Sequence, residues 1–216
     1  MTIVKFPNKL DEVLRQGTSR LYKKNGLIFF QDEDADRVFY LNDGSVRFSY
    51  YIGEKRRILG YADNEEFLGM EAVLINARCF EISAEAVCDC LVTVLARDVF
   101  IQLLKEPEFT FYCLQKISKK FLVFFKKTKS LYFLDSQKRV ESSLLWMAEQ
   151  LFSLDNQLKI TLSHQELAEL SNVHRVTATR VLNNLQEKSI LKKNKKTIVI
   201  TREGMKKLEN DIDRED

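Results

Sequence analysis

Short apolar runs separated by turn residues fill the first half of the chain. They recur at a spacing of roughly 8 to 12 residues, which is typical of the strands of a sandwich or barrel. Between two of them, Asn42-Asp43-Gly44 supplies the positive-φ positions of a hairpin turn. The runs cover residues 19–22, 27–30, 37–41, 45–52, 57–61, 80–86 and 91–95. With short helices expected at residues 8–17 and 97–106, they predict a β-barrel domain over residues 1–106.

A helical period replaces this pattern after Pro107 and predicts one long helix over residues 107–134. Its apolar residues alternate in steps of three and four, the spacing of a coiled-coil seam. The seam consists of Leu114, Ile117, Phe121, Phe124, Thr128 and Leu131. A second apolar stripe beside it contains Phe111, Leu122, Phe125 and Tyr132. One stripe can pack on the barrel while the other needs a partner, so we predict a parallel homodimer. The alternative is that a single chain absorbs both stripes.

The helical period breaks at Leu134 and Asp135, which we interpret as a hinge. Asp135 can accept hydrogen bonds from the first turn of the next helix, which is predicted over residues 137–152. We therefore expect the third domain to cover residues 135–216, with a short strand at residues 159–162 and an acidic, frayed tail from Leu208 onward.

A pair of short helices is predicted after this strand. Ser163 and Glu166 form a capping-box pattern at the start of the first helix. Asn172 ends it, because asparagine tolerates the left-handed conformation that a tight turn requires. The second helix is expected from His174 to Lys188, with a mostly polar outer face. Two such helices indicate a helix-turn-helix.

Basic residues follow the two helices and predict a β-hairpin wing. A basic turn at residues 192–196 leads into a β-branched strand at residues 197–201. From residue 163 to 207 there are ten Lys and Arg against four Asp and Glu, a surplus of six, whereas the whole chain carries only +3. Positive charge is thus concentrated where a phosphate backbone can lie. The plainer reading is a solvated basic surface.

Composition and motifs argue against several classes of protein. The chain is 45% hydrophobic and 30% charged, as in globular proteins, and its seven glycines are few for glycine-rich phosphate loops. It contains no Walker loop, HExxH or nucleophile elbow, and both histidines lie in the third domain, so we do not expect an enzyme or a metal site. No leader pattern and no apolar run of about 18 residues is present, which leads us to expect no membrane association and a cytoplasmic location.

The cysteines are Cys79, Cys88, Cys90 and Cys113, and none forms a CxxC pair. We expect Cys88 and Cys90 to share one face of a strand. Burial in the core is the expected role of the four thiols, with redox or metal sensing as the alternative.

Barrel, long helix, Asp hinge and winged helix-turn-helix, in that order, resemble the CRP/FNR family of bacterial transcription regulators. The resemblance runs from about residue 15 to 207. Its most specific part is VHRVTATRVLNNL at residues 173–185, which is similar to the family's recognition-helix signature and also to that of the halorespiration regulators. VFYLNDGSV at residues 38–46 and EFLG at residues 66–69 match in spacing. The resemblance implies an α+β fold with a cyclic-nucleotide-binding-like jelly-roll barrel, a dimerisation helix and a winged helix-turn-helix.

The resemblance further implies that Val176, Thr179 and Arg180 read bases in the major groove. Arginine can bind guanine O6 and N7 together, whereas valine offers apolar contact that suits a thymine methyl group. We therefore predict an AT-rich inverted repeat, closer to TTAAT than to TGTGA. RNA polymerase is the further partner that the resemblance implies. Phosphate contacts are expected from His174, Arg175, Thr177, Lys192, Lys193, Lys195 and Lys196.

The effector site departs from the family's cyclic-nucleotide pattern. Relatives that bind cyclic AMP carry Gly-Glu and then Arg-Ser, and the same spacing from Gly69 gives Met70, Phe80 and Glu81 here. No guanidinium remains for the cyclic phosphate, and Glu81 repels it, although Arg78 lies two residues away. The iron–sulfur and haem chemistries of the family also lack their ligands in this sequence.

We therefore expect no cofactor and a small aromatic or apolar effector of unknown identity. Its pocket is predicted to be lined by Phe48, Tyr50, Tyr61, Met70, Phe80, Glu81, Phe124 and Phe125. Two alternatives stay open: a constitutive or thiol-controlled regulator of the same fold, and a metabolite-binding module without DNA activity.

Overall fold

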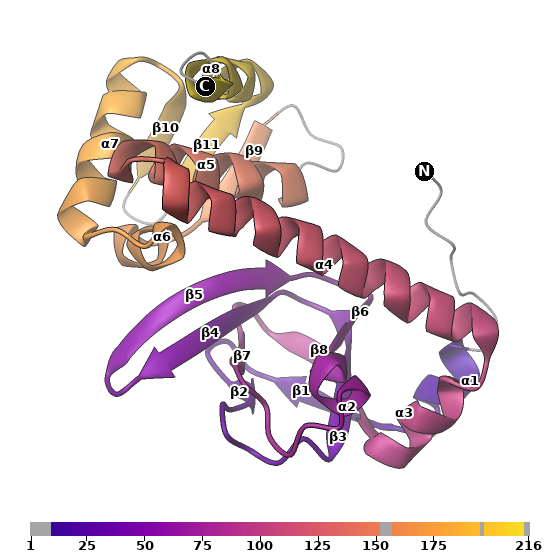
Figure 1. Cartoon of the computed structure of the whole chain (residues 1–216). Coiled ribbons are helices and arrows are strands. Elements are labelled where there is room, and N and C mark those ends of the chain that lie inside the picture. Colours follow the sequence, from indigo (N-terminus) through magenta and orange to yellow (C-terminus); the bar gives the residue numbers. More distant parts are fainter. Residues whose placement is uncertain (1–9, 152–156, 195–196, 214–216) are drawn as a thin grey trace. The chain divides into compact units, whose positions relative to one another are not determined.

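The computed structural model describes residues 10–151, 157–194 and 197–213 of the chain (Figure 1). The chain divides into two compact units, Met1–Val123 and Phe124–Asp216. The division falls inside the long helix α4 (Pro107–Phe133). The combination of a β-sheet unit, a long helix and a helix-turn-helix confirms the predicted α+β class.

Two antiparallel four-stranded sheets, ordered β1-β8-β3-β6 and β2-β7-β4-β5, form the jelly-roll-like barrel of the first unit. The strands are β1 (Thr18–Tyr22), β2 (Leu27–Phe29), β3 (Arg37–Asp43), β4 (Val46–Ile52), β5 (Lys55–Ala62), β6 (Glu66–Leu68), β7 (Ser83–Ala86) and β8 (Cys90–Ala96). The helices that accompany them are α1 (Leu10–Leu14), α2 (Met70–Leu74), α3 (Arg97–Leu103) and the first part of α4. All seven predicted strands are present, while β6 and α2 were not predicted because each is too short to show a period.

The predicted hairpin at Asn42-Asp43-Gly44 is wrong. β3 and β4 lie in different sheets, so this turn carries the chain from one sheet to the other. Gly44 has φ +114°, and a Cβ there would lie 2.5 Å from the Sγ of Cys90. The two-residue hairpin is instead Gly53-Glu54, where Ile52 pairs with Lys55. α1 ends at Leu14, before the predicted end at residue 17, and residues 8 and 9 of that prediction lie outside the described residues.

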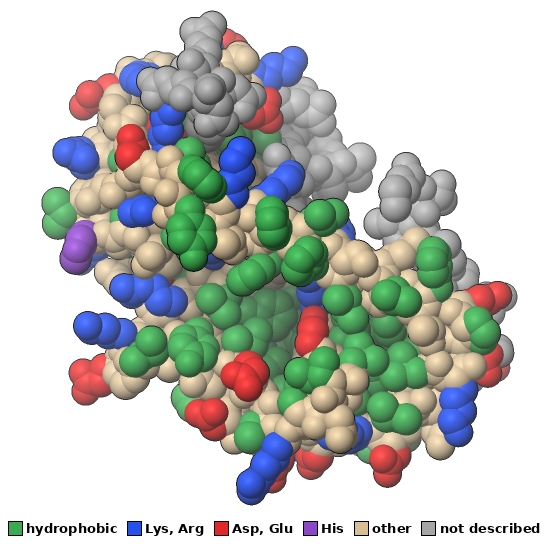
Figure 2. All heavy atoms as spheres, viewed as in Figure 1, with side chains coloured by type: hydrophobic (Ala, Val, Ile, Leu, Met, Phe, Trp, Pro, Cys, Tyr) green, Lys and Arg blue, Asp and Glu red, His purple; other side chains and the backbone are tan. Residues whose placement is uncertain are grey.

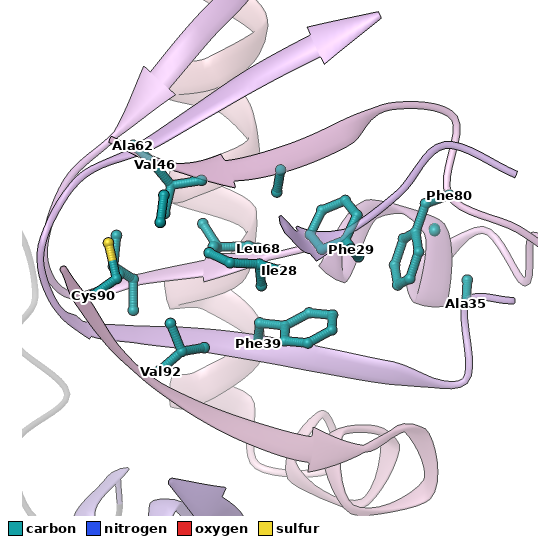
Figure 3. Packing of buried hydrophobic residues seen from close by; sticks show 14 residues of the cluster. Ile28, Phe29, Ala35, Phe39, Val46, Ala62, Leu68, Phe80, Cys90 and Val92 are labelled. Carbon is teal, nitrogen blue, oxygen red and sulfur yellow. The ribbon is translucent and has the colours of Figure 1, made fainter. Parts of the chain in front are cut away.

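An aromatic cluster fills one end of the space between the two sheets (Figure 3). Phe29 stacks on Phe80 with ring centroids 4.2 Å apart and on Phe39 at 5.3 Å. A second core joins α1, α3 and the start of α4 to the barrel through Phe67, Phe100 and Phe109. Each such side chain contributes about 1.5–3 kcal/mol by leaving water. These two cores fix the beginning of α4 on the barrel.

The rest of α4 carries its apolar residues on the surface. In the seam, Leu114 is 55% exposed, Phe121 60% and Phe124 65%, whereas Ile117 packs partly against the barrel core. The second stripe is also exposed, with Phe111, Leu122, Phe125 and Tyr132 all accessible. Hydrophobic side chains accordingly gather along α4 in Figure 2. Among the described residues, most side chains of the two stripes are therefore exposed.

The second unit contains a three-stranded antiparallel sheet in the order β10-β11-β9 and the helices around it. Its elements are α5 (Ser136–Leu151), β9 (Gln157–Thr161), α6 (His164–Ser171), α7 (Arg175–Glu187), β10 (Leu191–Asn194), β11 (Thr197–Thr201) and α8 (Arg202–Asp213). Asp135 caps α5 as predicted, because its Oδ1 accepts from the backbone N–H groups of Gln137 at 2.8 Å and Lys138 at 2.9 Å.

The predicted frayed tail does not begin at Leu208, because α8 continues to Asp213. Leu208 lies in α8 and is fully buried. α8 packs against α5 and β11, so its apolar side closes the core that α5, α6 and α7 share. The acidic character of the tail hid this amphipathic helix.

The cysteines occupy different environments. Cys90 and Cys113 are buried, Cys79 is half-buried and Cys88 is exposed. Cys88 and Cys90 do not share a strand face, because β8 begins only at Cys90. In the described part of the chain no group of three or more His, Cys, Asp and Glu side chains is placed to hold a metal ion. Nor does any described helix have the length and apolar character needed to cross a membrane.

Candidate nucleic-acid interface

Capping residues fix where the two short helices of the second unit, α6 and α7, begin and end. The capping box is confirmed: Ser163 Oγ accepts from the N–H of Glu166 at 3.1 Å, and Glu166 Oε2 accepts from the N–H of Ser163 at 2.8 Å. Asn172 ends α6 in the left-handed conformation with φ 51°, as expected. The chain can then turn sharply into α7, whose N-cap is His174. α6, this turn and α7 form the predicted helix-turn-helix.

α7 has one buried and one exposed face. The buried face packs into the domain core through Ala178, Val181, Leu182 and Leu185. On the opposite face Val176 is 80% exposed, and Arg175, Arg180 and Asn183 are exposed beside it. Val176 is therefore accessible to a partner that docks on this face.

A hollow of about 470 Å³ lies over this face, lined by His164, Arg175, Val176, Thr179, Arg180 and Asn183. Four of these residues were predicted DNA contacts. The predicted contacts His174 and Thr177 lie outside the lining. His164 and Asn183 were not among the predicted contacts, yet both face the same space. The capping box places His164 in the first turn of α6, but no local signal shows that this turn lies beside α7.

Side-chain contacts of His164 and Lys193 connect the exposed face of α7 to α6 and to β10. The Nδ1 of His164 lies 2.9 Å from Thr179 Oγ1. Lys193 Nζ donates to Asn183 Oδ1, so the wing strand β10 is bonded to α7. Partial burial, followed by the positive charges of Lys193 and Arg175, lowers the pKa of His164 below its ordinary value. The hollow is therefore electropositive and favours an anionic partner such as a phosphate backbone.

The wing differs in detail from the predicted basic turn. Lys192 and Lys193 lie within β10, opposite Val199 and Ile198 of β11, and consequently point to opposite faces of the sheet. Lys192 is exposed and Lys193 is half-buried beside α7. Lys195 and Lys196 lie outside the described residues.

The eight residues predicted to line an effector pocket fall in several environments. Met70 and Phe80 are core side chains, 1% and 2% exposed, and they belong to two different clusters. The chain at Gly69 passes so close to the Phe80 ring that a Cβ there would lie 2.7 Å from it. Phe48 and Tyr61 are half-buried, and Tyr50 and Glu81 are exposed. Phe124 and Phe125 belong to the second unit and are exposed.

Lysines on the barrel-facing side of α4 were missed in the sequence. Lys120 Nζ donates to Glu71 Oε1 at 2.9 Å and to Phe67 O at 3.4 Å. Lys116 Nζ lies 5.4 Å from the centroid of the Tyr112 ring. Helical spacing from the buried Phe109 and Tyr112 carries this face to both lysines, and that spacing could have revealed them.

Two family models match the chain. One describes a cyclic nucleotide-binding domain and matches residues 19–106. The other describes a Crp-like helix-turn-helix domain and matches residues 138–208. The two matches coincide with the barrel and with the unit that carries the hollow over α7.

Characterised proteins are similar over nearly the whole chain. A global nitrogen regulator of Nostoc sp. is 31% identical over 188 residues, covering 83% of this chain and 83% of that protein. A cAMP-activated global transcriptional regulator of Salmonella typhimurium is 25% identical over 183 residues, covering 83% and 87%. The solved structure of a c-di-GMP-responsive global regulator of Xanthomonas campestris has a TM-score of 0.78 at 24% identity, covering 89% of this chain and 98% of that one, and shares the fold.

Proposed function

Because the chain belongs to the CRP/FNR family of transcription regulators, we propose that it controls transcription by binding an AT-rich inverted repeat as a homodimer. The observation that carries the proposal is the exposed face of α7, where Val176, Thr179 and Arg180 surround one electropositive hollow. In this proposal Arg180 pairs with a guanine edge and Val176 covers a thymine methyl group. His174, Arg175, Thr177, Lys192 and Lys193 contact phosphates, which fix the register on the duplex.

The exposed stripes of α4 support the homodimer. Leu114, Phe121, Phe124 and Leu131 present apolar surface along one side of a helix, and a second copy of the same helix covers such a seam. Two recognition helices then enter successive major grooves about 34 Å apart, which requires a pseudo-palindromic site. RNA polymerase is the further partner proposed for the DNA-bound dimer.

We propose a small effector that is not a cyclic nucleotide. Met70 and Phe80, which stand where cyclic-AMP-binding relatives carry their ligand residues, belong to the hydrophobic core. The buried guanidinium of Arg47 is already engaged by Glu85 Oε1 at 2.5 Å. The ammonium group of Lys120 is likewise engaged by Glu71. These pairings occupy the cations of Arg47 and Lys120, so neither is available to a cyclic phosphate.

Effector binding is proposed to bias two arrangements of the dimer through the Leu134–Asp135 hinge, so that only one places the recognition helices correctly. The cap that Asp135 provides fixes where α5 begins after this break.

Operator affinity tests the proposal. Fluorescence anisotropy on a labelled TTAAT-type inverted repeat is measured alone and with small aromatic acids, cyclic AMP or c-di-GMP. Tightening with an aromatic acid alone supports both operator and effector assignments. Tightening with a cyclic nucleotide contradicts the effector assignment. Binding no tighter than to scrambled DNA under every condition contradicts the proposed operator.

A further inference from the structure

We propose that His164 is a specificity-determining positioning residue, which sets whether the Thr179 hydroxyl donates or accepts toward DNA and so makes base preference depend on pH. The inference deepens the proposed operator binding and rests on it. His164 itself acts through Thr179 and does not read a base in this scheme.

The geometry places the two side chains in direct contact. His164 begins α6, and the capping box between Ser163 and Glu166 fixes the first turn of that helix. Its Nδ1 lies 2.9 Å from Thr179 Oγ1 near the middle of α7. Both side chains are half-buried and line the hollow. The hydroxyl that faces DNA is therefore held by a group that can change its proton count.

The proposed switch operates between the cationic ring and the neutral Nε2–H tautomer, which differ in whether Nδ1 donates or accepts. A threonine hydroxyl has one hydrogen to donate and two lone pairs, whereas both ring nitrogens of a cationic imidazole are donors. When His164 is cationic, Nδ1–H donates to Oγ1, and the hydroxyl hydrogen is free for a base acceptor such as N7 or thymine O4. When His164 is neutral with its hydrogen on Nε2, Nδ1 accepts the hydroxyl hydrogen. Oγ1 then offers lone pairs alone, which suit adenine N6 or cytosine N4 donors.

Partial burial of the ring, and then the charges around it, favour one state in the free protein. Partial burial and the cations of Lys193 on β10 and Arg175 on α7 lower the pKa of His164. Arg180 on α7 lines the same hollow, and Glu166 on α6 is engaged in the capping box. Among described residues, α5 contributes no ionisable side chain to the lining. The lowered pKa favours the neutral ring of His164 in the free protein, whereas nearby DNA phosphates favour the cation.

Proton uptake on binding follows from this difference. DNA raises the pKa of His164 above its free value, so affinity for operators that offer an acceptor to Thr179 increases as pH falls through that interval. Affinity for operators that offer a donor at the same position increases less or decreases. The ratio of the two affinities is the quantity that reports the switch.

The test uses the full-length dimer and four operators that differ only at the base pair facing Thr179. Anisotropy at about pH 5.5 and about pH 8 brackets the ordinary range of histidine titration. The wild-type preference ratio is expected to change about three- to tenfold between the two pH values, the size of one hydrogen bond. His164→Gln and Thr179→Val should each give a ratio that does not change with pH.

His174→Gln is the comparison variant, because the chain has only two histidines and His174, a proposed phosphate contact, makes no side-chain hydrogen bond to α7. Loss of a phosphate contact should lower the affinity for all four operators alike, so the preference ratio of this variant should change with pH as it does in the wild type. A wild-type ratio independent of pH, or an unaltered response in His164→Gln, overturns the inference while leaving operator binding intact. Absence of specific binding by wild type at both pH values overturns the proposed function as well. Circular dichroism of each variant verifies that it is folded.

Discussion

Lys120 Nζ lies 2.9 Å from Glu71 Oε1 and donates a hydrogen bond to it, joining the middle of α4 to α2. The same ammonium group lies 5.8 Å from the centroid of the Phe48 ring on β4. One side chain of α4 therefore contacts two separate parts of the barrel, and its neighbours Phe121 and Leu122 face outward. The barrel-facing side of the helix is thus charged at this point.

A double-mutant cycle with Lys120→Met and Glu71→Gln should give a coupling free energy of at most about 1 kcal/mol. The two side chains are 31% and 47% exposed, so water screens the pair. Urea unfolding of both single variants and the double variant provides the measurement. Coupling above about 2 kcal/mol would show that the pair is effectively buried.

Phe80→Ala should lower the free energy of unfolding by about 3–5 kcal/mol, because it removes a ring packed against Phe29 and Phe39. Ile75→Ala, at a side chain that is 76% exposed, is the control and should change stability by less than about 0.5 kcal/mol. Chemical denaturation compares the two. Equal and small effects would mean that Phe80 lines an open pocket after all.

Phe121→Glu should weaken self-association, since it places a carboxylate in the middle of the exposed seam of α4. Sedimentation velocity should then show a monomer at concentrations where the wild type is dimeric. The control is Ile52→Glu, which changes an exposed apolar side chain at the end of β4, away from the seam. If both variants dimerise like the wild type, the seam is not the interface.

Arg180→Ala and Lys192→Ala should weaken operator binding in different ways. Loss of Arg180 should cost about 1–3 kcal/mol and relax preference at one base pair. Loss of Lys192, exposed on β10, should weaken binding to all sequences and reduce the salt slope by about one. Affinity measured over a salt series separates the two effects, and identical slopes for Lys192→Ala and wild type would place β10 away from the phosphates.

Thiol labelling at about pH 8 should modify Cys88 first and leave Cys113 unmodified, because the thiolate is the reactive form. Burial raises the pKa of Cys113 to about 12, so its thiol is protonated under these conditions. Burial also raises the pKa of Cys90. Mass spectrometry after brief alkylation identifies the modified positions, with Cys88→Ser as the control. Rapid modification of Cys113 would indicate that the start of α4 opens from the barrel.

Local signals in the sequence were enough for the helix-turn-helix. The Ser163–Glu166 capping box and the left-handed Asn172 involve neighbours in the chain, so they could be predicted without knowing what packs around them. The same holds for the cap of α5 at Asp135.

Contacts between distant residues account for what could not be predicted. The Asn42-Asp43-Gly44 turn has hairpin chemistry, yet β4 pairs with β5 and β7 rather than with β3. His164 and Thr179 are fifteen positions apart, and their contact depends on how α6 packs against α7. Nothing within either helix sequence indicates that contact.

The turn at Gly44 also constrains which substitutions natural selection can accept at a distant position. A Cβ at residue 44 would collide with Cys90, and the positive φ already disfavours any other residue there. Position 90 is therefore restricted to side chains small enough to lie against that glycine, whatever their redox chemistry. Relatives that retain the glycine should consequently carry Cys, Ser or Ala at this site. A cysteine retained here would be explained by the small size of its side chain and not by thiol chemistry.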